Sequence, residues 1–176
     1  AMGITALVAR RIGEGKHEEA AVTAMQAIWI AVLVSVPFAV VGIVWARELL
    51  ALMGADAWTL QHGYRYMQWA LGGNMVIMLL FVINAIFRGA GDAAIAMRVL
   101  WVANSLNIVL DPILIFGFGP VPAMGVEGAA IATNIGRGAG VLMQLWILFR
   151  GGQHIRVLGS QIAWHGATLW NIVRTS

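Results

Sequence analysis

Two long stretches without a charged residue constrain the fold of this chain more than any other feature. Residues 20–46 are 27 consecutive uncharged positions, and residues 66–87 are another 22. About 20 apolar residues are enough for a helix to cross the hydrocarbon core of a bilayer. Both stretches are therefore predicted to be membrane-spanning helices.

Two further spans are predicted at 99–118 and 124–149, although charges interrupt both. Asp111 lies in the first, and Glu127 and Arg137 lie in the second. The composition agrees with a membrane protein, because only 11% of the residues are charged, against about 25% in a soluble domain. We therefore expect an all-α integral membrane protein with four transmembrane helices, rather than four buried helices of a soluble protein.

The basic residues predict which loops face the cytoplasm. If the loop 10–19 is cytoplasmic and the sides alternate, the segments 88–98 and 150–176 are cytoplasmic as well. The inside segments then hold eight basic residues and the outside segments two: Arg10, Arg11, Lys16, Arg88, Arg98, Arg150, Arg156 and Arg174, against Arg47 and Arg65. Loops rich in Lys and Arg stay on the cytoplasmic side, so we expect a multi-pass protein of the plasma (inner) membrane.

The same distribution argues against a nucleic-acid partner. The sequence pI is about 10.2, but the basic residues do not gather into one binding face. The chain has no cysteine, so disulfides and thiolate metal sites are not available. No nucleophile–base arrangement or carboxylate pair is visible, and we do not expect an enzyme.

Both ends of the chain read as cuts through a longer protein. Residues 1–9 are typical of the last turns of an upstream helix, and no basic leader or signal peptide precedes them. Residues 150–176 are weakly amphipathic and stop without a terminator. We therefore expect residues 1–149 to be a partial transmembrane lobe, followed by a truncated cytoplasmic linker.

Asp111 is the most informative residue for chemistry. An acid at membrane depth costs roughly 2.5–3.5 kcal/mol on insertion scales and usually marks an ion or proton path. Asn104, Asn107 and Asp111 are spaced i, i+3, i+7, which places them on one helical face. Pro112 follows directly and removes the hydrogen bond to the carbonyl of residue 108. The result is a polar stripe beside a freed backbone carbonyl.

Two functions fit this stripe. Asp111 could take up and release a proton, or Asp111 and Asn107, with a hydroxyl such as that of Thr133, could supply hard oxygen ligands to Na⁺. The sequence does not choose between them. The competing interpretation is structural, with Asp111 capping a kinked helix or pairing with Arg137. We favour ion or proton binding, because a kink needs only Pro112.

Other polar and small residues have simpler interpretations. Arg137 either snorkels toward the cytoplasmic interface or pairs with an acid. Gln68 is expected to form hydrogen bonds between helices, and Gly136 with Gly140 is expected to allow close helix packing. Gly54 suits the end of a short helix, and Asp56 suits the start of the next one.

Several runs of the sequence resemble the MATE (multidrug and toxic compound extrusion) transporters. The most specific are NSLNIVLDP at 104–112 and GVEGAAIAT at 125–133, in that order. Shorter matches lie at 12–15, 52–55 and 87–92. The resemblance extends over nearly the whole chain.

The resemblance implies helices three to six of the N-terminal lobe of a twelve-helix, two-lobed antiporter. It implies that Asn107 and Asp111 contribute to a cation site, with Thr133 nearby on helix six. Members of the family export cationic or amphipathic drugs and metabolites in exchange for Na⁺ or H⁺, with no other cofactor. The family's helix-one acid and C-terminal lobe have no counterpart in these residues.

Two alternatives stay open. A flippase for lipid-linked oligosaccharides of the same superfamily would show a basic central cavity, for which Arg137 is the only candidate. A membrane assembly subunit without transport activity would use the same helices only for packing.

Overall fold

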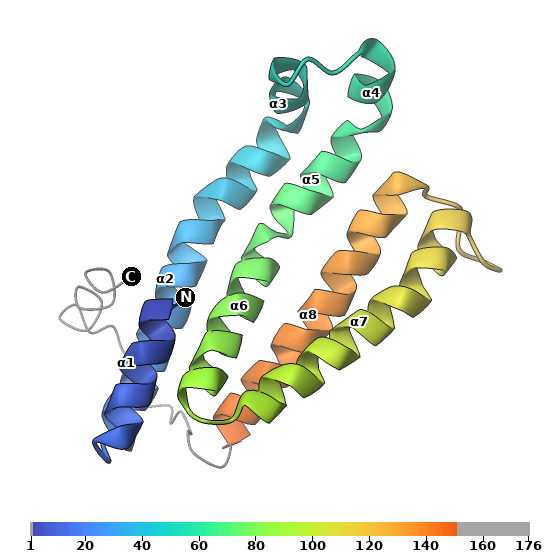
Figure 1. Ribbon diagram of the computed structural model, residues 1–176. Helices are drawn as coiled ribbons and strands as arrows, with labels where there is room; N and C mark the ends of the chain where they lie inside the picture. The colour runs from blue at the N-terminus through green and yellow to red at the C-terminus, as the bar shows by residue number, and fades with distance from the viewer. Residues whose placement is uncertain (1, 151–176) are drawn as a thin grey trace. The chain divides into compact units, whose positions relative to one another are not determined.

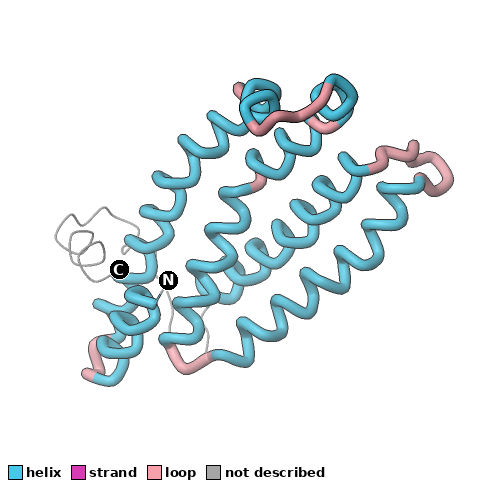
Figure 2. The backbone as a smooth tube through the Cα atoms, turned by 45° about the horizontal axis from the view of Figure 1, so that its top comes forward, coloured by secondary structure: helices cyan, strands magenta, loops and turns pink. Residues whose placement is uncertain are grey.

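The computed structural model describes residues 2–150, and these are almost entirely helical (Figure 1). The helices are α1 (Met2–Gly13), α2 (His17–Val44), α3 (Ala46–Leu52), α4 (Ala57–His62), α5 (Tyr64–Gly72), α6 (Asn74–Gly89), α7 (Ala93–Phe116) and α8 (Val126–Arg150). Short turns connect most of them, and a longer loop, 117–125, connects α7 to α8 (Figure 2). The predicted all-α class is confirmed. The linker predicted at 150–176 lies outside the described residues, apart from Arg150.

The described residues divide into two compact units. The first unit comprises residues 2–33, 78–101 and 140–150, and the second comprises Val34–Ile77 and Val102–Ala139. The long helices α2, α6, α7 and α8 contribute residues to both units. The loops 10–19 and 88–98, which are predicted to be cytoplasmic, belong to the first unit. The polar stripe of Asn104, Asn107 and Asp111 belongs to the second.

In the first unit, α1 packs closely against α6. The hydroxyl of Thr5 donates a hydrogen bond of 3.2 Å to the carbonyl of Ala85. A Cβ at Gly89 would lie 2.7 Å from the carbonyl oxygen of Thr5, so the glycine allows the two backbones to approach. Val8 of α1 and Phe87 of α6 are fully buried in this unit.

The turn between α1 and α2 is shorter than the predicted loop 10–19. Arg10 and Arg11 lie in the last turn of α1, where positive charge interacts favourably with the helix dipole. Arg10 Nε donates to Glu14 Oε1 at 2.9 Å, and this bond lowers the pKa of the Glu14 carboxyl. Arg11 pairs with Glu19 of α2. The basic residues therefore join the two helices through ion pairs.

Three helical segments of the described chain are long and apolar enough to cross a membrane. They are His17–Val44, Tyr64–Gly89 and Ala93–Phe116, which overlap the first three predicted spans. Large apolar side chains stand exposed on them, such as Phe38 at 62% and Ile108 at 73%. Apolar faces of this extent suit contact with acyl chains.

The fourth predicted span forms a helix, α8, but it does not belong to this apolar group. It is 25 residues long, which is enough for a span. Its composition differs because it carries Glu127, Thr133, Asn134 and Arg137 among glycines and alanines. Hydropathy alone therefore identifies three spans, and α8 is recognised by its length and its place in the sequence.

The predicted span 66–87 is divided in the structure. α5 ends at Gly72 and α6 begins at Asn74, so the helix is interrupted at Gly73. A side chain at Gly73 would overlap the side-chain amide of Asn134. The absence of a side chain at Gly73 therefore makes room for the amide of Asn134 from α8.

The short helices α3 and α4 lie in the second unit and follow the predicted caps. Gly54, just after α3, has φ +81°, a conformation that glycine adopts without strain. Asp56 is the N-cap of α4 and accepts a hydrogen bond of 3.0 Å from the backbone N–H of Thr59. Hydrogen bonds with Thr59 lower the pKa of the Asp56 carboxyl. Both predicted caps are confirmed.

Candidate functional site

The polar stripe lies near the C-terminal end of α7, in the second unit. Asp111 is five residues before the end of the helix at Phe116, and Pro112 is accommodated inside the helix. Asn107 and Asp111 are half-buried, whereas Asn104 is exposed. The stripe therefore separates into two inner residues and one outer residue.

The two inner residues carry oxygens that have no partner. Asn107 Oδ1 and Asp111 Oδ1 are buried and accept no hydrogen bond from any described residue. Leaving a buried polar atom unsatisfied costs about 1–3 kcal/mol. Because the two residues are one helical turn apart, their side chains can bind the same small ion. A buried acceptor pair of this kind suits a hard cation or a proton.

The donor set also limits which ion fits. Within residues 2–150, no group of three or more His, Cys, Asp or Glu side chains gathers around a common point. The stripe offers one carboxylate and amide oxygens, and Pro112 leaves one more backbone carbonyl without its helical donor. Oxygen ligands with a single negative charge suit a weakly bound monovalent cation better than a transition metal.

Glycines of α8 bring that helix against the stripe. A Cβ at Gly136 would lie 2.8 Å from the carbonyl oxygen of Ala103 and 3.6 Å from the Cβ of Asn107. A Cβ at Gly128 would overlap the backbone of Leu114. Figure 1 shows α7 and α8 side by side in this region. The packing predicted for small residues of α8 is therefore present at Gly128 and Gly136.

Thr133 lies beside a cavity of about 360 Å³ in the second unit. Its hydroxyl donates to the carbonyl of Ala129, one turn earlier, at 2.9 Å. The cavity is lined by Tyr66, Ala70, Ile77, Ala129, Ala130, Thr133, Asn134 and Arg137. No residue of α7 is among these, so Thr133 lines this cavity without Asn107 or Asp111.

Arg137 lines the same cavity and makes no ion pair with Asp111 in the described residues. It lies in the interior of α8, eleven residues after the helix begins at Val126. Snorkelling toward the cytoplasmic interface stays a prediction for this residue.

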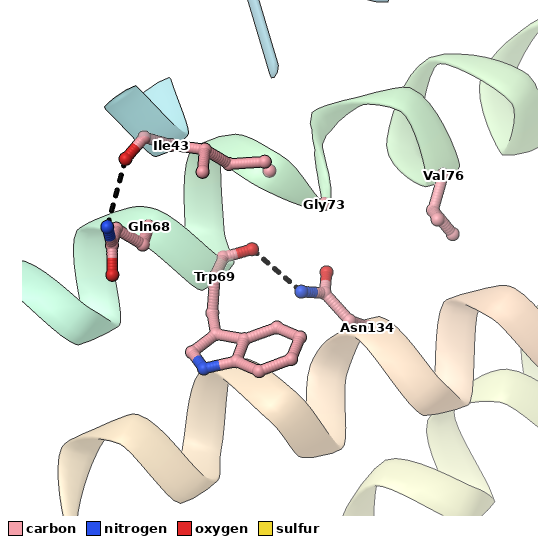
Figure 3. A pocket seen from close by; sticks show the side chains of 7 residues that line it. Ile43, Gln68, Trp69, Gly73, Val76 and Asn134 are labelled. Atoms are coloured by element: carbon pink, nitrogen blue, oxygen red, sulfur yellow. Dashed lines mark hydrogen bonds between the residues drawn. The ribbon is translucent and has the colours of Figure 1, made fainter. Parts of the chain in front are cut away.

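A second cavity of about 470 Å³ lies between α2, α5, α6 and α8 in this unit (Figure 3). Trp69 and Asn134 border it, and Asn134 Nδ2 donates a hydrogen bond of 2.7 Å to the carbonyl of Trp69. Gln68 Nε2 donates to the carbonyl of Ile43 at 2.9 Å. The interhelical role predicted for Gln68 is confirmed. Asn134 was not predicted to have such a role.

Glu127 is the centre of a polar cluster at the start of α8. Its Oε1 accepts a hydrogen bond of 3.1 Å from the indole N–H of Trp69, and its Oε2 lies 3.6 Å from Arg65 Nη1. The sequence contains no local signal for this cluster, because its members are about sixty positions apart along the chain. Only the pairing of α5 with α8 brings them together.

The first unit contains one further polar contact that was not predicted. Gln144 is fully buried in α8 and donates a hydrogen bond of 2.7 Å from Nε2 to Asn84 Oδ1 on α6. Polar contacts of this kind hold membrane helices together.

These features define a multi-pass membrane protein whose helices pack through glycines and carry buried, unpartnered oxygens on Asn107 and Asp111. Comparison with known proteins identifies its kind. The model of the MatE family matches residues 1–113, well over half of the chain. The chain belongs to the MATE family, and its helices fit the family's architecture of two six-helix lobes.

Two relatives and one solved structure illustrate the match. The FAD transporter of Shewanella oneidensis is 32% identical over 131 residues, which are 74% of this chain and 29% of that protein. The probable multidrug resistance protein NorM of Thermotoga maritima is 30% identical over 149 residues, 85% of this chain and 32% of that protein. The chain spans about a third of the length of these curated relatives.

The solved structure is described as the inward-facing conformation of a multidrug resistance MATE family transporter of the MOP superfamily. It is 30% identical and matches with a TM-score of 0.82, covering 99% of this chain and 41% of that chain.

Proposed function

We propose that this chain is part of a secondary active transporter that exports cationic or amphipathic drugs or metabolites in exchange for Na⁺ or H⁺. The pair of unpartnered buried oxygens on Asn107 and Asp111 supports this proposal most directly. A small cation or a proton bound there satisfies these two oxygens, for which no described residue supplies a hydrogen-bond donor. The transporter works in the plasma (inner) membrane, with loops 10–19, 88–98 and 150–176 in the cytoplasm.

The chemistry of coupling follows from differential binding. An ion shifts a protein between two conformations only if it binds one of them better. Occupation of the Asp111 site neutralises the carboxylate and satisfies both oxygens, which stabilises the arrangement of α7 and α8 that surrounds them. Release of the ion to the other side returns the lobe to its first state. Transport requires that this alternation be joined to substrate binding in the complete protein.

The relatives indicate two kinds of substrate. NorM of Thermotoga maritima is named as a probable multidrug resistance protein, and the Shewanella oneidensis relative is named as an FAD transporter. Drug export is therefore our first proposal for this chain, and export of a nucleotide-bearing metabolite is the second. The cavity that Arg137 lines is the observation that favours the second.

The test is ion-driven export by the complete natural protein in liposomes. A fluorescent cation is loaded, and an inward Na⁺ gradient or an inward proton gradient is imposed separately. We expect Asp111→Asn to lose gradient-driven export and Asn107→Ala to require a higher ion concentration. Glu48→Gln is the control, because Glu48 is an exposed acid on α3. Wild-type export by Asp111→Asn under both gradients contradicts the proposal.

A further inference from the structure

We propose that the cavity beside Arg137 binds the anionic group, a phosphate or a carboxylate, of an amphipathic substrate. This inference rests on the proposed transport function and names a class of substrate for it. The cavity measures about 360 Å³, and a water molecule takes up about 30 Å³ in the liquid. There is room for a phosphate or carboxylate and for part of the molecule that carries it.

The charge of Arg137 is permanent, and no acid among the described residues pairs with it. A guanidinium stays protonated at all physiological pH values. None of the described acids lies within ion-pair distance of Arg137, and the acid nearest along α8, Glu127, is already bound to Trp69 and Arg65. Arg137 lies near the middle of α8 and is half-buried. Its side chain lines the cavity without pairing with any described acid.

The other polar groups at the cavity can add donors. Asn134 uses one amide N–H for the carbonyl of Trp69, and a side-chain amide has a second N–H. Tyr66 is also in the lining and has a phenolic hydroxyl, whereas the single O–H of Thr133 is already donated to the carbonyl of Ala129. Arginine with nearby amide and hydroxyl donors is a typical binding site for phosphate and carboxylate, and its fork can bind either group through two parallel bonds.

The lining also argues against a cation as the occupant. It contains no Asp or Glu, and its remaining members are small or apolar residues of α5, α6 and α8. The cation ligands Asn107 and Asp111 are on α7, which contributes nothing to this cavity. Apart from Thr133, the predicted cation site and the anion cavity therefore consist of separate residues, and Asp111 and Arg137 can be tested independently.

The first experiment measures anion binding by thermal stability of the complete natural protein in a neutral detergent. The probes are benzoate and phenyl phosphate, with benzamide as the uncharged counterpart of benzoate, all at one ionic strength. We expect both anions to raise the Tm saturably and benzamide to have little effect. In Arg137→Gln the affinity for the anions falls by roughly 10–100-fold, because a hydrogen bond to a charged group is lost. Equal responses of the wild type to benzoate and benzamide overturn the proposal.

Two further variants separate recognition from folding. Arg137→Lys keeps the charge but loses the planar fork, so we expect an affinity between those of the wild type and Arg137→Gln. Arg65→Gln is the control, because Arg65 is an exposed arginine outside the cavity that pairs with Glu127. An anion response that survives in both Arg137 variants, or that disappears in Arg65→Gln, contradicts the assignment.

A lipid headgroup could supply the same phosphate, and one arm of the experiment distinguishes this source. Phosphatidylglycerol is added to the detergent micelles, with phosphatidylcholine in a parallel sample. If a small fraction of phosphatidylglycerol abolishes the response to benzoate, a lipid occupies the site and the substrate assignment is wrong. We expect the response to persist in both lipids.

The two proposals fail in different ways. Gradient-driven export of the fluorescent cation tests Asp111, whereas the benzoate response and its dependence on Arg137 test the anion site. If Asp111→Asn exports normally and the anion response depends on Arg137, the coupling site is wrong and the anion site stands. If the anion response is absent and Asp111→Asn does not export, only the anion site is wrong.

Discussion

Replacing Gly136 with alanine adds one methyl group where α8 packs against α7. The new Cβ would lie 2.8 Å from the carbonyl oxygen of Ala103 and 3.6 Å from the Cβ of Asn107. The closer atom belongs to the backbone, so it cannot rotate away as a side chain would. The two helices must separate by roughly 0.5–1 Å, and a gap of that size removes a quarter to a half of the dispersion energy of the contacts involved.

The expected cost follows from two opposing effects. Overpacking a well-packed contact destabilises a protein by about 1–3 kcal/mol, whereas alanine is better than glycine in a helix by about 0.5–1 kcal/mol. The net loss for Gly136→Ala is then roughly 1–2 kcal/mol. With about 2–4 °C per kcal/mol for a domain of this size, the Tm falls by roughly 2–8 °C.

Gly138 provides a matched control two residues further along α8. Nothing lies within 4 Å of a Cβ placed there, so Gly138→Ala gains the helix preference without the clash. We expect its Tm to equal or exceed that of the wild type. The assay is thermal unfolding of the complete natural protein in detergent, followed by the loss of the monodisperse peak in size-exclusion chromatography.

The same displacement affects the candidate ion site, because Asn107 lies directly beside Gly136. We expect Gly136→Ala to need more Na⁺ or a steeper proton gradient for half-maximal export, and Gly138→Ala to export as the wild type does. Equal Tm shifts in the two variants, or a Gly136→Ala protein as stable as the wild type, refute the packing argument.

Two further predictions concern polar contacts of the second unit. The lowered pKa of Asp56 means that its ionised form stabilises α4 above the usual carboxyl pKa, and that this is lost as the pH falls through the lowered folded-state pKa. In Asp56→Asn, hydrogen exchange at the Thr59 amide, corrected for the intrinsic rate, keeps its protection and loses this pH dependence, since asparagine caps equally well; an unchanged pH dependence contradicts the assignment. Trp69→Phe removes the N–H that donates to Glu127, and a double-mutant cycle with Glu127→Ala, which removes the acceptor, is expected to give a coupling of roughly 0.5–1.5 kcal/mol in thermal unfolding; a coupling near zero means that the bond does not form in the membrane protein.

Features that depend on local sequence were predictable. Two charge-free stretches predicted α2 and the span formed by α5 and α6, because the apolar length of a helix is a property of its own residues. The caps at Gly54 and Asp56 were predictable because they depend only on nearby residues. Gly54 adopts a positive φ, and Asp56 accepts a hydrogen bond from a residue three positions later. The stripe of Asn107 and Asp111 followed from helical periodicity alone.

Features that depend on contacts between helices were not predictable in the same way. The absence of a side chain at Gly73 makes room for Asn134, which is distant in sequence. The bonds of Glu127 to Trp69 and of Gln144 to Asn84 likewise require knowledge of which helices are neighbours. A single sequence contains no record of such pairings. The site assignment of Asn104, Asn107, Asp111 and Thr133 stays a prediction until ion binding is measured.

The boundaries of helices show a third limit. The predicted span begins at residue 99 because Arg98 interrupts the apolar sequence. A single arginine does not end a helix, and α7 begins six residues earlier, at Ala93. A hydropathy pattern locates the part of a helix in the bilayer, whereas propensity and capping decide where the helix itself begins.

The interruption at Gly73 has a consequence for how this family varies in sequence. The carbonyl of Trp69 accepts one hydrogen bond from Gly73 N–H and another from Asn134 Nδ2, while the missing side chain at position 73 leaves room for that amide. A larger residue at 73 is acceptable only if position 134 becomes smaller, and the second bond is then lost. In an alignment of relatives, positions 73 and 134 are therefore expected to covary in side-chain size.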